Sequence, residues 1–431
     1  MPSSRLPRVL ARSAGLFLFT LTPAVAQEAL SLPGNVPFTS HVYCDFGHGV
    51  NWAIAHAPDS RPLVVVIHGV CNENVTIDRS RVTLRGIDPS QSGIRGVEET
   101  DPITDSPITI RGGFDVAVEN LTVSNGGSSG IAMRSADARI ENCVIESNAN
   151  SDIGAGVFVG ASASVRLLGV TVQNNVNGGV WIDRGGFAAV VDSLIQGNHG
   201  FGIRVSTGAS ARVGIDLAGA LGPSTIINNV EDGIALLRSG SALVQGNTVM
   251  GNGRFGVLVS QGSSVSLTGN VISGNGGSEV LASDTATARL EGNTVTDDSS
   301  TSIAGTPLTV ARGSTAHLVG GNTLLQQNAA TTAIAITVAF NSALRQDTGS
   351  GDTVSGPQAV SVLDLSHADL RQDFTLNGSV EISHLSKFRV QGSGTIDGDV
   401  HVNSSSAIAQ RIGTGVTITG TCSGSGACIG F

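Results

Sequence analysis

The 431-residue sequence is poor in lysine and in charged residues of either sign. Lys387 is its only lysine, charged residues make up 13% of the chain, and the formal net charge is −10 at pH 7. A chain of net negative charge is a poor partner for the phosphate backbone of nucleic acids and for anionic lipid. We therefore expect neither nucleic acid nor an anionic membrane as a partner.

Long apolar runs are also missing from most of the chain. Beyond residue 26 no apolar stretch is long enough to span a membrane, so we expect no membrane-spanning segment. The 57 glycines of the sequence argue against repeats built from helices, because glycine is a poor helix former. This composition excludes helical solenoids.

Several catalytic and metal-binding motifs are absent as well. The sequence has no His-Glu-x-x-His and no Cys/His spacing typical of a metal site. We therefore expect no metal and no cofactor.

The first 26 residues have the pattern of a secretory signal peptide. Arg5, Arg8 and Arg12 precede an apolar core, and Ala24-Val25-Ala26 fits an A-x-A cleavage site. The pattern predicts a secreted protein, either extracellular or periplasmic in a Gram-negative cell.

Five cysteines in a secreted chain permit two disulfides and leave one thiol. Cys422 and Cys428 lie six residues apart, and Cys44 and Cys71 both lie in the N-terminal part, so we predict these two pairs. Cys143 remains, and we expect it to be a small buried residue. It shares a column of the repeat with Asn120, Val170, Ser193, Ser224, Asn247, Asn270 and Asn293.

An asparagine recurs through the middle of the chain, most often at a spacing of 23 residues. Such self-similarity is typical of a solenoid, in which one coil stacks on the next. The recurring positions are Asn125, Asn148, Asn175, Asn198, Asn229, Asn252 and Asn275, followed by Asp298 and Asn328.

Each coil contains three short runs in which apolar residues alternate with polar ones, which is the periodicity of a β-strand. One coil has Val257-Leu258-Val259, then Val265-Ser266-Leu267, then Val271-Ile272, with turns between them. The sequence therefore predicts an all-β fold, a right-handed parallel β-helix of three short strands per ~23-residue coil. About fifteen coils are expected, spaced by about 4.8 Å.

The recurring asparagines have a structural explanation. An inward amide can bond the backbone of its own turn and the asparagine of the next coil, forming a ladder. Asparagine and glycine also tolerate the left-handed backbone that tight turns require. We interpret these asparagines as structural and not catalytic.

The period divides the chain into four segments. Residues 1–26 are the signal peptide, 27–60 an N-terminal cap, 61–330 the repeats, and 331–431 irregular coils with a disulfide-tied cap. Residues 48–57 have the pattern of a short amphipathic helix that could cover the open N-terminal end, since an exposed sheet edge invites aggregation.

The alignment of coils predicts which side chains face outward together. Phe158, Trp181 and Arg204 are neighbours in one outward column, with Arg134 and Asp183 beside them. Aromatic rings pack on the CH faces of sugars, and charged groups bond hydroxyls or carboxylates, so this group is a candidate glycan-binding site. The alternative is an exposed aromatic pair that only stabilises the sheet.

A second group lies in or near the turn that follows each asparagine. Asp152, His199 and Glu231 are weak candidates for an acid and a base, although nothing in the sequence fixes their geometry. The plainer interpretation of Glu231 is a surface ion pair with Arg254, one coil away.

The repeat "GNTVMGNGRFGVLVSQGSSVSLTGNVISGN" and the stretch "VVVIHGVCNENVTIDRSRVTLRGI" resemble the parallel β-helix repeats of the pectin-lyase-like superfamily. Cys71 replaces the aromatic residue common in that N-terminal segment. The resemblance implies a carbohydrate-related protein. The family's catalytic motifs are missing, however: Gly47-His48-Gly49 precedes the repeats without acidic partners, and there is no Asp-Pro-His-Glu.

Two functions remain open from the sequence. The first is a secreted, non-catalytic β-helix that binds a polysaccharide or cell-envelope glycan, or serves as an envelope or adhesion scaffold. The alternative is a polysaccharide lyase, epimerase or hydrolase whose site no motif marks.

Overall fold

The computed structural model describes residues 36–47, 49–97, 105–148, 154–298, 305–328, 330, 332–346 and 351–431. Residues 37–431 form one compact unit. The predicted signal peptide, the candidate Asp152 and His48 lie outside the described residues.

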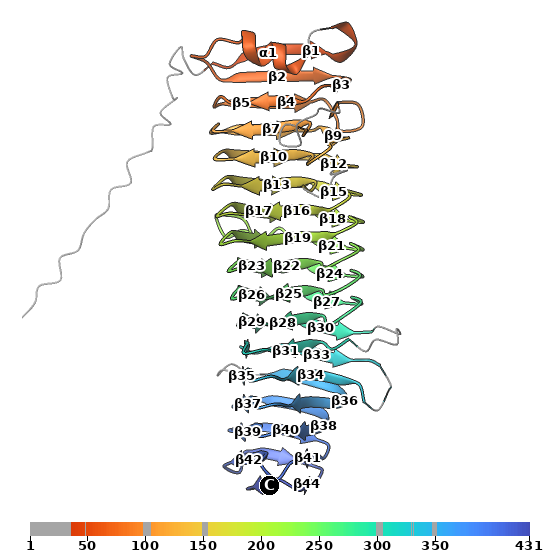
Figure 1. Cartoon of the computed structure of the whole chain (residues 1–431), viewed down its shortest axis with the longest axis vertical. Coiled ribbons are helices and arrows are strands. Elements are labelled where there is room, and N and C mark those ends of the chain that lie inside the picture. Colours follow the sequence, from red (N-terminus) through yellow and green to blue (C-terminus); the bar gives the residue numbers. More distant parts are fainter. Residues whose placement is uncertain are drawn as a thin grey trace, which may run out of the picture. The chain divides into compact units, whose positions relative to one another are not determined.

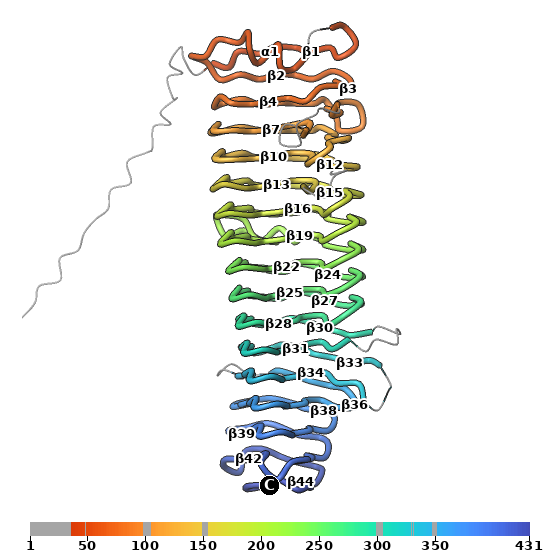
Figure 2. Tube along the Cα trace, viewed as in Figure 1, coloured from red at the N-terminus to blue at the C-terminus, as the bar shows by residue number. Residues whose placement is uncertain are grey.

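This unit is a parallel β-solenoid of about 16 turns. Its coils stack in chain order, from helix α1 (Val50–His56) at one end to strand β44 (Cys422–Gly424) at the other (Figures 1 and 2). Each strand pairs in parallel with its counterpart in the next coil, as β25 (Val257–Val259) does with β28 (Val280–Ala282). The predicted all-β solenoid is confirmed.

The three runs of each coil stack into three faces. Face 1 contains β4 (Val75–Ile77), β7 (Ile108–Arg111), β10 (Ile131–Arg134), β13 (Val157–Gly160), β16 (Gly178–Ile182), β19 (Phe201–Ser206), β22 (Ile234–Leu237), β25, β28, β31 (Leu308–Val310), β34 (Ile334–Val338), β41 (Val400–Val402) and β44. Face 2 contains β1 (Phe38–Tyr43), β2 (Leu63–His68), β5 (Val82–Gly86), β8 (Val116–Glu119), β11 (Asp137–Glu141), β14 (Ser164–Leu168), β17 (Phe187–Val191), β20 (Ser210–Val213), β23 (Ser241–Gln245), β26 (Ser264–Thr268), β29 (Thr287–Glu291), β32 (Thr315–Leu318), β35 (Ala343–Gln346), β37 (His367–Leu370), β39 (Lys387–Gln391), β42 (Ile408–Ile412) and β45 (Ala427–Ile429). Face 3 contains β3 (Val70–Asn72), β6 (Gly93–Arg95), β9 (Thr122–Ser124), β12 (Val144–Glu146), β15 (Thr171–Gln173), β18 (Leu194–Gln196), β21 (Thr225–Ile227), β24 (Thr248–Met250), β27 (Val271–Ser273), β30 (Thr294–Asp297), β33 (Thr323–Gln326), β40 (Gly394–Asp397) and β43 (Val416–Ile418).

The interior is a continuous column of aliphatic side chains from all three faces. In one coil Val257 and Val259 come from face 1, Leu267 from face 2 and Ile272 from face 3, and all four are fully buried. The residues between them point outward, because successive side chains of a strand alternate between its two sides. The alternation in the sequence thus separates the core from the surface.

The corner between face 3 and face 1 is held by a ladder of buried amides. In each step the Oδ1 atom of one asparagine accepts the backbone N–H and the Nδ2–H of the asparagine one coil earlier, at 2.8–3.1 Å. Each Nδ2 also donates to a backbone carbonyl of the preceding coil. The members are Asn148, Asn175, Asn198, Asn229, Asn252 and Asn275.

Asn125 does not belong to this ladder, so the prediction for this residue was wrong. Strand register places Ser124 opposite Glu146, which leaves Gly126 opposite Asn148. The Gly126 N–H donates to Asn148 Oδ1, while the Asn125 side chain bonds the carbonyl of Gly96. Asn125 occupies the preceding position, where the backbone is left-handed (φ 61°). Asparagine suits both positions, so its presence alone could not distinguish them.

The two later positions assigned to this ladder were also wrong. Asp298 is exposed, and Asn328 is only half-buried. Glu279 instead accepts the backbone N–H and Nδ2–H of Asn275 and ends the ladder. Farther on, the buried side chains of Asp297 and Gln326 bond each other at this corner.

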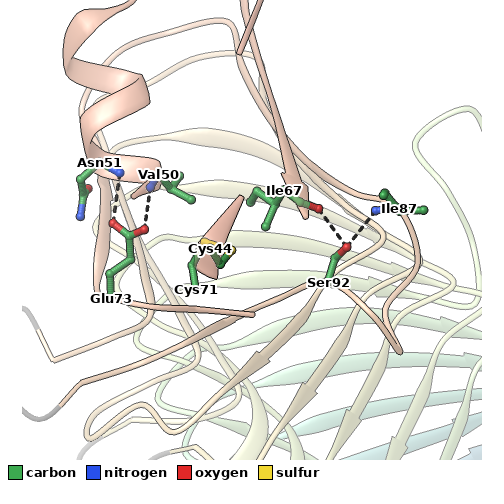
Figure 3. The surroundings of a disulfide bond; sticks show 8 residues. All are labelled: Cys44, Val50, Asn51, Ile67, Cys71, Glu73, Ile87 and Ser92. Carbon is green, nitrogen blue, oxygen red and sulfur yellow. Dashed lines mark hydrogen bonds between the residues drawn. A yellow bond between two sulfur atoms is a disulfide. The ribbon is translucent and has the colours of Figure 1, made fainter. Parts of the chain in front are cut away.

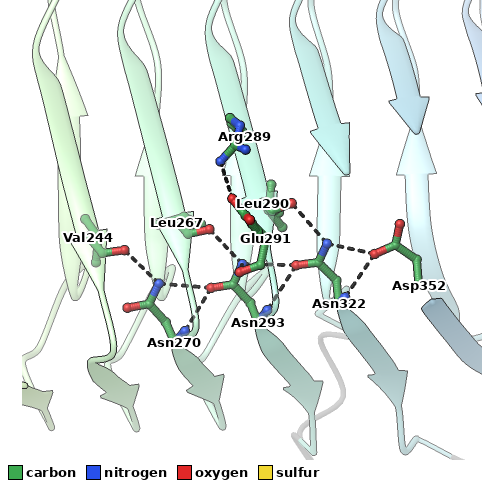
Figure 4. A network of polar contacts seen from close by, with 9 residues as sticks. All are labelled: Val244, Leu267, Asn270, Arg289, Leu290, Glu291, Asn293, Asn322 and Asp352. Atoms are coloured by element: carbon green, nitrogen blue, oxygen red, sulfur yellow. Dashed lines mark hydrogen bonds and ion pairs between the residues drawn. The ribbon is translucent and has the colours of Figure 1, made fainter. Parts of the chain in front are cut away.

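A second ladder, which the sequence analysis did not identify, holds the corner between face 2 and face 3. Figure 4 shows Asn270, Asn293 and Asn322 donating in turn to the next coil, and Asn322 donating to Asp352. Its earlier positions are occupied by Val170, Ser193, Ser224 and Asn247. This is the column assigned to Cys143, except that Leu121 and not Asn120 lies opposite the cysteine, because Glu119 pairs with Glu141.

In both ladders the asparagine N–H groups donate toward the C-terminal end of the solenoid. Each ladder ends on a buried acidic side chain, Glu279 in the first and Asp352 in the second. The last asparagine of each ladder presents its N–H groups there, so a side chain with acceptor oxygens fits that position. Burial raises the pKa of Glu279 to about 8, against the opposing effect of its two hydrogen bonds from Asn275.

The coils change beyond the end of the first ladder. Strands β36 (Asp352–Val362) and β38 (Phe374–Ile382) each run through the corner between face 3 and face 1 as one long strand. Each pairs with strands of both faces, and the register shifts between Ser355 and Gln358. Both strands lie in the segment 331–431, for which irregular coils were predicted. Here one long strand replaces two short ones, because the described residues place no buried asparagine at this corner.

Both predicted disulfides are confirmed, and both lie at ends of the solenoid. Cys44–Cys71 joins the N-terminal cap to β3, beside α1, whose first N–H groups bond Glu73 (Figure 3). Helix α1 lies within the predicted range 48–57. Cys422–Cys428 joins the last two strands of the chain.

Cys143 is free and buried, and burial raises the pKa of its thiol to about 12, so it is unreactive.

Replacing a ladder asparagine should destabilise the solenoid. Asn229→Leu removes the acceptor of two Asn198 N–H groups and leaves the carbonyl of Ile195 without its side-chain donor. We expect a loss of roughly 1–3 kcal/mol in the free energy of unfolding, measured by urea titration. Asn72→Leu, at an exposed asparagine, is the control. Equal stability of the two variants would show that the ladder does not hold this corner.

The raised pKa of Glu279 predicts a pH dependence of stability. The folded state binds a proton at Glu279 between its ordinary pKa of 4.5 and about 8, whereas the unfolded state has lost it. Stability should therefore fall as pH rises through this range, by at most about 5 kcal/mol at about 1.4 kcal/mol per pKa unit. In Glu279→Gln this part of the pH dependence should be absent when urea midpoints at pH 5 and pH 8 are compared. A slope equal to that of the wild type would contradict the assignment.

Candidate functional site

Face 1 carries a cavity of about 300 Å³ near its N-terminal end. Phe158 and Trp181 line it, together with Asp183 and the arginines Arg134, Arg184 and Arg238. The cavity therefore contains four of the five residues that the sequence analysis grouped as a glycan site. The fifth, Arg204, does not line the cavity but lies over the Trp181 ring.

Strand register explains why these residues meet. Phe158 of β13 pairs with Trp181 of β16, and Trp181 pairs with Arg204 of β19. The residues on either side of Trp181, Val180 and Ile182, are fully buried, which directs the indole outward. One column of the parallel sheet thus places two aromatic rings and an arginine on successive coils.

The aromatic rings do not stack in parallel. The Phe158 and Trp181 centroids are 5.5 Å apart and their planes meet at 84°, which is an edge-to-face contact. The Arg204 guanidinium instead covers the indole, with Cζ 5.1 Å from the Trp181 centroid. The two rings therefore do not form one flat platform.

Phe201 belongs to this group and was missed. It lies at the start of β19, its ring centroid is 6.3 Å from that of Trp181, and Arg204 covers it at 5.6 Å. Gly178, one coil earlier, leaves the space for the ring, since a Cβ there would lie 2.5 Å from it. The outward column used in the sequence analysis does not include Phe201. It lies in the same sheet as Arg204 because β19 already begins at residue 201.

A chain of hydrogen bonds fixes the indole and the carboxylate. Trp181 Nε1 donates to Ser206 Oγ at 3.1 Å, and Ser206 Oγ donates to Asp183 Oδ1 at 2.8 Å. The other carboxylate oxygen, Oδ2, lies 3.3 Å from Arg184 Nε. Asp183 is buried rather than open to solvent, so it orders the aromatic side chains as well as contributing charge.

Arg204 is more enclosed than the three arginines that line the cavity. Burial lowers the pKa of Arg204, and the charge of Arg238 lowers it further. Its Nε atom is buried and makes no hydrogen bond to any of the described residues. Stacking on Trp181 and Phe201 therefore holds this guanidinium in place.

The candidate catalytic residues do not join this cavity. His199 and Glu231 are exposed in turns and are not among the residues that line it. The predicted pair of Glu231 with Arg254 is wrong, because Arg254 lies 4.0 Å from Asp232 and packs on Phe255. Glu231 meets Arg254 only through its backbone carbonyl. Register between turns is not fixed by strand pairing, which is why the neighbouring acid was chosen wrongly.

The model of the protein family described as "Right handed beta helix region" matches two overlapping segments of the chain. These segments are residues 65–216 and 188–330, and together they span more than half of the chain. The chain belongs to the right-handed β-helix family. The match also confirms the predicted hand of the solenoid. No curated protein matched this β-helix.

Solved structures similar to this β-helix include an epimerase module and a tailspike protein. The A-module of mannuronan C-5 epimerase AlgE4 from Azotobacter vinelandii is 13% identical, with TM-score 0.39, covering 85% of this chain and 99% of that one. The Dettilon tailspike protein is 14% identical, with TM-score 0.43, covering 90% and 68%. We draw no conclusion about substrate from likenesses this distant.

Two further observations concern the described residues alone. None of their helices is long and apolar enough to cross a membrane. Nor do three of their His, Cys, Asp or Glu side chains gather where they could hold a metal ion.

Proposed function

We propose that this β-helix is a secreted, non-catalytic protein that binds a glycan in the face 1 cavity. The observation that carries the proposal is the meeting of Phe158 and Trp181 with Asp183 and several arginines in one cavity. The residue types, their fixed geometry and the charge of the cavity each support it.

The aromatic side chains suit a sugar ring. Phe158 and Trp181 are half-buried, so each keeps an accessible edge or face while the rest of the ring is held by the protein. Sugar CH groups pack on such surfaces, and the Trp181 indole keeps its place because its N–H is already bonded to Ser206. A cavity of about 300 Å³ is at the lower end of the range of ligand pockets, which suits one or two sugar units.

The charges favour a glycan with hydroxyl and carboxylate groups. Arg134, Arg184 and Arg238 line the cavity with one carboxylate, Asp183, and Arg184 is already paired with it. Arg134 and Arg238 are exposed and can donate paired hydrogen bonds to a ligand carboxylate. An acidic sugar should therefore bind more tightly than a neutral one.

The state of Asp183 supports binding over catalysis. Glycoside hydrolysis ordinarily uses two carboxyl groups, one of which must exchange a proton. Asp183 is the one carboxylate among the residues that line the cavity, and Ser206 and Arg184 occupy both its oxygens. A polysaccharide lyase, epimerase or hydrolase remains the alternative, and turnover of a panel of uronans, followed as new double bonds or shortened chains, would establish it.

Secretion is part of the proposal. Two disulfides, Cys44–Cys71 and Cys422–Cys428, fit an oxidising compartment, and residues 1–26 have the signal-peptide pattern. Appearance of the mature chain, beginning after Ala26, in the periplasm or medium of a Gram-negative host would support secretion.

Truncating the indole should weaken glycan binding while the solenoid remains folded. Trp181→Ala removes the sugar-packing surface and the support of Arg204, so affinity should fall about tenfold, or by more than 1 kcal/mol. Titration calorimetry with acidic and neutral oligosaccharides measures it. The chain's other tryptophan, Trp52 on α1, provides the matched control Trp52→Ala. Equal binding by both variants, with unchanged melting curves, would refute the proposed site.

A further inference from the structure

Face 2 carries a column of basic side chains that runs along much of the solenoid. The register of successive strands places these residues in one outward line, broken by a few neutral residues and one aspartate. In order the column is Arg139, Arg166, Ala189, Arg212, Leu243, Ser266, Arg289, His317, Arg345, Asp369 and Arg389. Arg139, Arg166 and Arg289 already pair with neighbouring acidic side chains. The excess of positive charge therefore lies in the C-terminal part of the column.

The C-terminal part of this column opens into a second cavity, of about 330 Å³, which we call the basic pocket. Its polar lining consists of Arg345, His367, Asp369, Arg371, Lys387 and Arg389. Four of these are permanent cations and one is a carboxylate. Lys387, the only lysine of the sequence, is among them.

Asp369 organises the arginines of the basic pocket. It is buried, and it accepts hydrogen bonds from Arg371 at 3.1 Å and from Arg389 Nε at 2.9 Å. Although burial alone raises the pKa of Asp369, the hydrogen bonds from Arg389 and Arg371 lower it overall. One ionised carboxylate therefore fixes two of the guanidinium groups that line the pocket.

Arg345 and Lys387 supply the two remaining cations of the pocket. Among the described residues, Arg345 and Lys387 form no ion pair, and Lys387 is exposed. Arg345 lies next to Asp369 in the column, and Lys387 is opposite His367 on the adjoining strand. The pocket thus carries an excess of three positive charges over Asp369, aimed at one solvent-open space.

We propose that the basic pocket binds the carboxylate or sulfate groups of an acidic polysaccharide that lies along face 2. Bidentate arginine donors suit both groups. From Arg345 the column continues through His317 to Arg289, which is paired with Glu291, at about 4.8 Å per coil. An extended acidic chain that is anchored in the pocket can follow this line.

The arrangement favours a polysaccharide over other anionic partners. Single-stranded nucleic acid is held by stacking its bases on aromatic rings, and no aromatic side chain except His367 lines the basic pocket. A membrane surface is broad, whereas the column is one residue wide on an acidic protein. A narrow line of charge fits a single extended chain.

The basic pocket and the cavity of Trp181 lie on different faces and share no residue. The two sites can therefore be tested separately. The basic pocket selects by charge, whereas the Trp181 cavity adds packing on aromatic rings. Failure of one proposal does not entail failure of the other.

The test is calorimetric titration of Arg345→Gln/Lys387→Gln with oligogalacturonate, a sulfated oligosaccharide and a neutral oligosaccharide. Neither residue bonds Asp369, so the fold should persist, as a melting curve will show. Because the Trp181 cavity can also take an acidic sugar, the titrations use Trp181→Ala as the background. Affinity for one or both acidic ligands should fall at least about tenfold, and wild-type affinity should drop with added salt.

The matched control is Arg95→Gln/Arg312→Gln, which removes two exposed arginines from outside the column. In the Trp181→Ala background, this control should bind the acidic ligands as tightly as Trp181→Ala alone. Loss of carboxylate binding alone, or of sulfate binding alone, would identify the ligand group. Equal affinities of the two double variants, or binding only to single-stranded nucleic acid or anionic vesicles, would overturn the proposal.

The single lysine supplies a second measurement. An amine-reactive ester should acylate Lys387 and the chain's amino terminus, and peptide mapping distinguishes the two. Bound oligogalacturonate or sulfated oligosaccharide should slow acylation of Lys387 severalfold while the amino terminus reacts as before. Labelling of Lys387 at an unchanged rate under saturating ligand would count against the pocket.

Discussion

Hydrogen bonds between buried amides at the corners of each coil are the interaction on which this fold depends. A coil of three short strands must reverse direction sharply, and the backbone groups in those turns are too enclosed for water to reach. Stacked asparagines such as Asn198 and Asn229 satisfy them, each bonding the coil before and the coil after. Where the first ladder ends at Glu279, the same corner later opens into the long strands β36 and β38.

Fixed corners keep strands in register, and register is what creates both candidate surfaces. A parallel sheet repeats each outward position about every 4.8 Å, so similar residues in successive coils become a continuous line. On face 1 this brings Phe158, Trp181 and Arg204 together. On face 2 it aligns arginines with His317 and Asp369. The ladders thus contribute to both candidate surfaces indirectly, because they keep successive strands in register.

The two surfaces use charge in different ways. At the face 1 cavity Asp183 is tied to Ser206 and so to the Trp181 indole, which orders an aromatic contact surface. In the basic pocket Asp369 holds Arg371 and Arg389, which orders hydrogen-bond donors. In each, a buried carboxylate positions neighbouring side chains. Arg134 and Arg238 at the first site and Lys387 at the second are exposed and remain available to a ligand.

The sequence by itself determined the fold, its hand, the two disulfides and the outward column through Trp181, because these follow from a regular period and alternating strands. It misplaced Asn125 by one residue, since asparagine fits both the ladder and the left-handed turn before it. Only the tertiary structure decided the burial of Asp183, the partner of Arg254 and the basic column. Residues of that column from Arg289 to Arg389 are 20 to 28 positions apart, so loops of unequal length hide it from any fixed period. Strand hydrogen bonding, which ignores loop length, brings them into line.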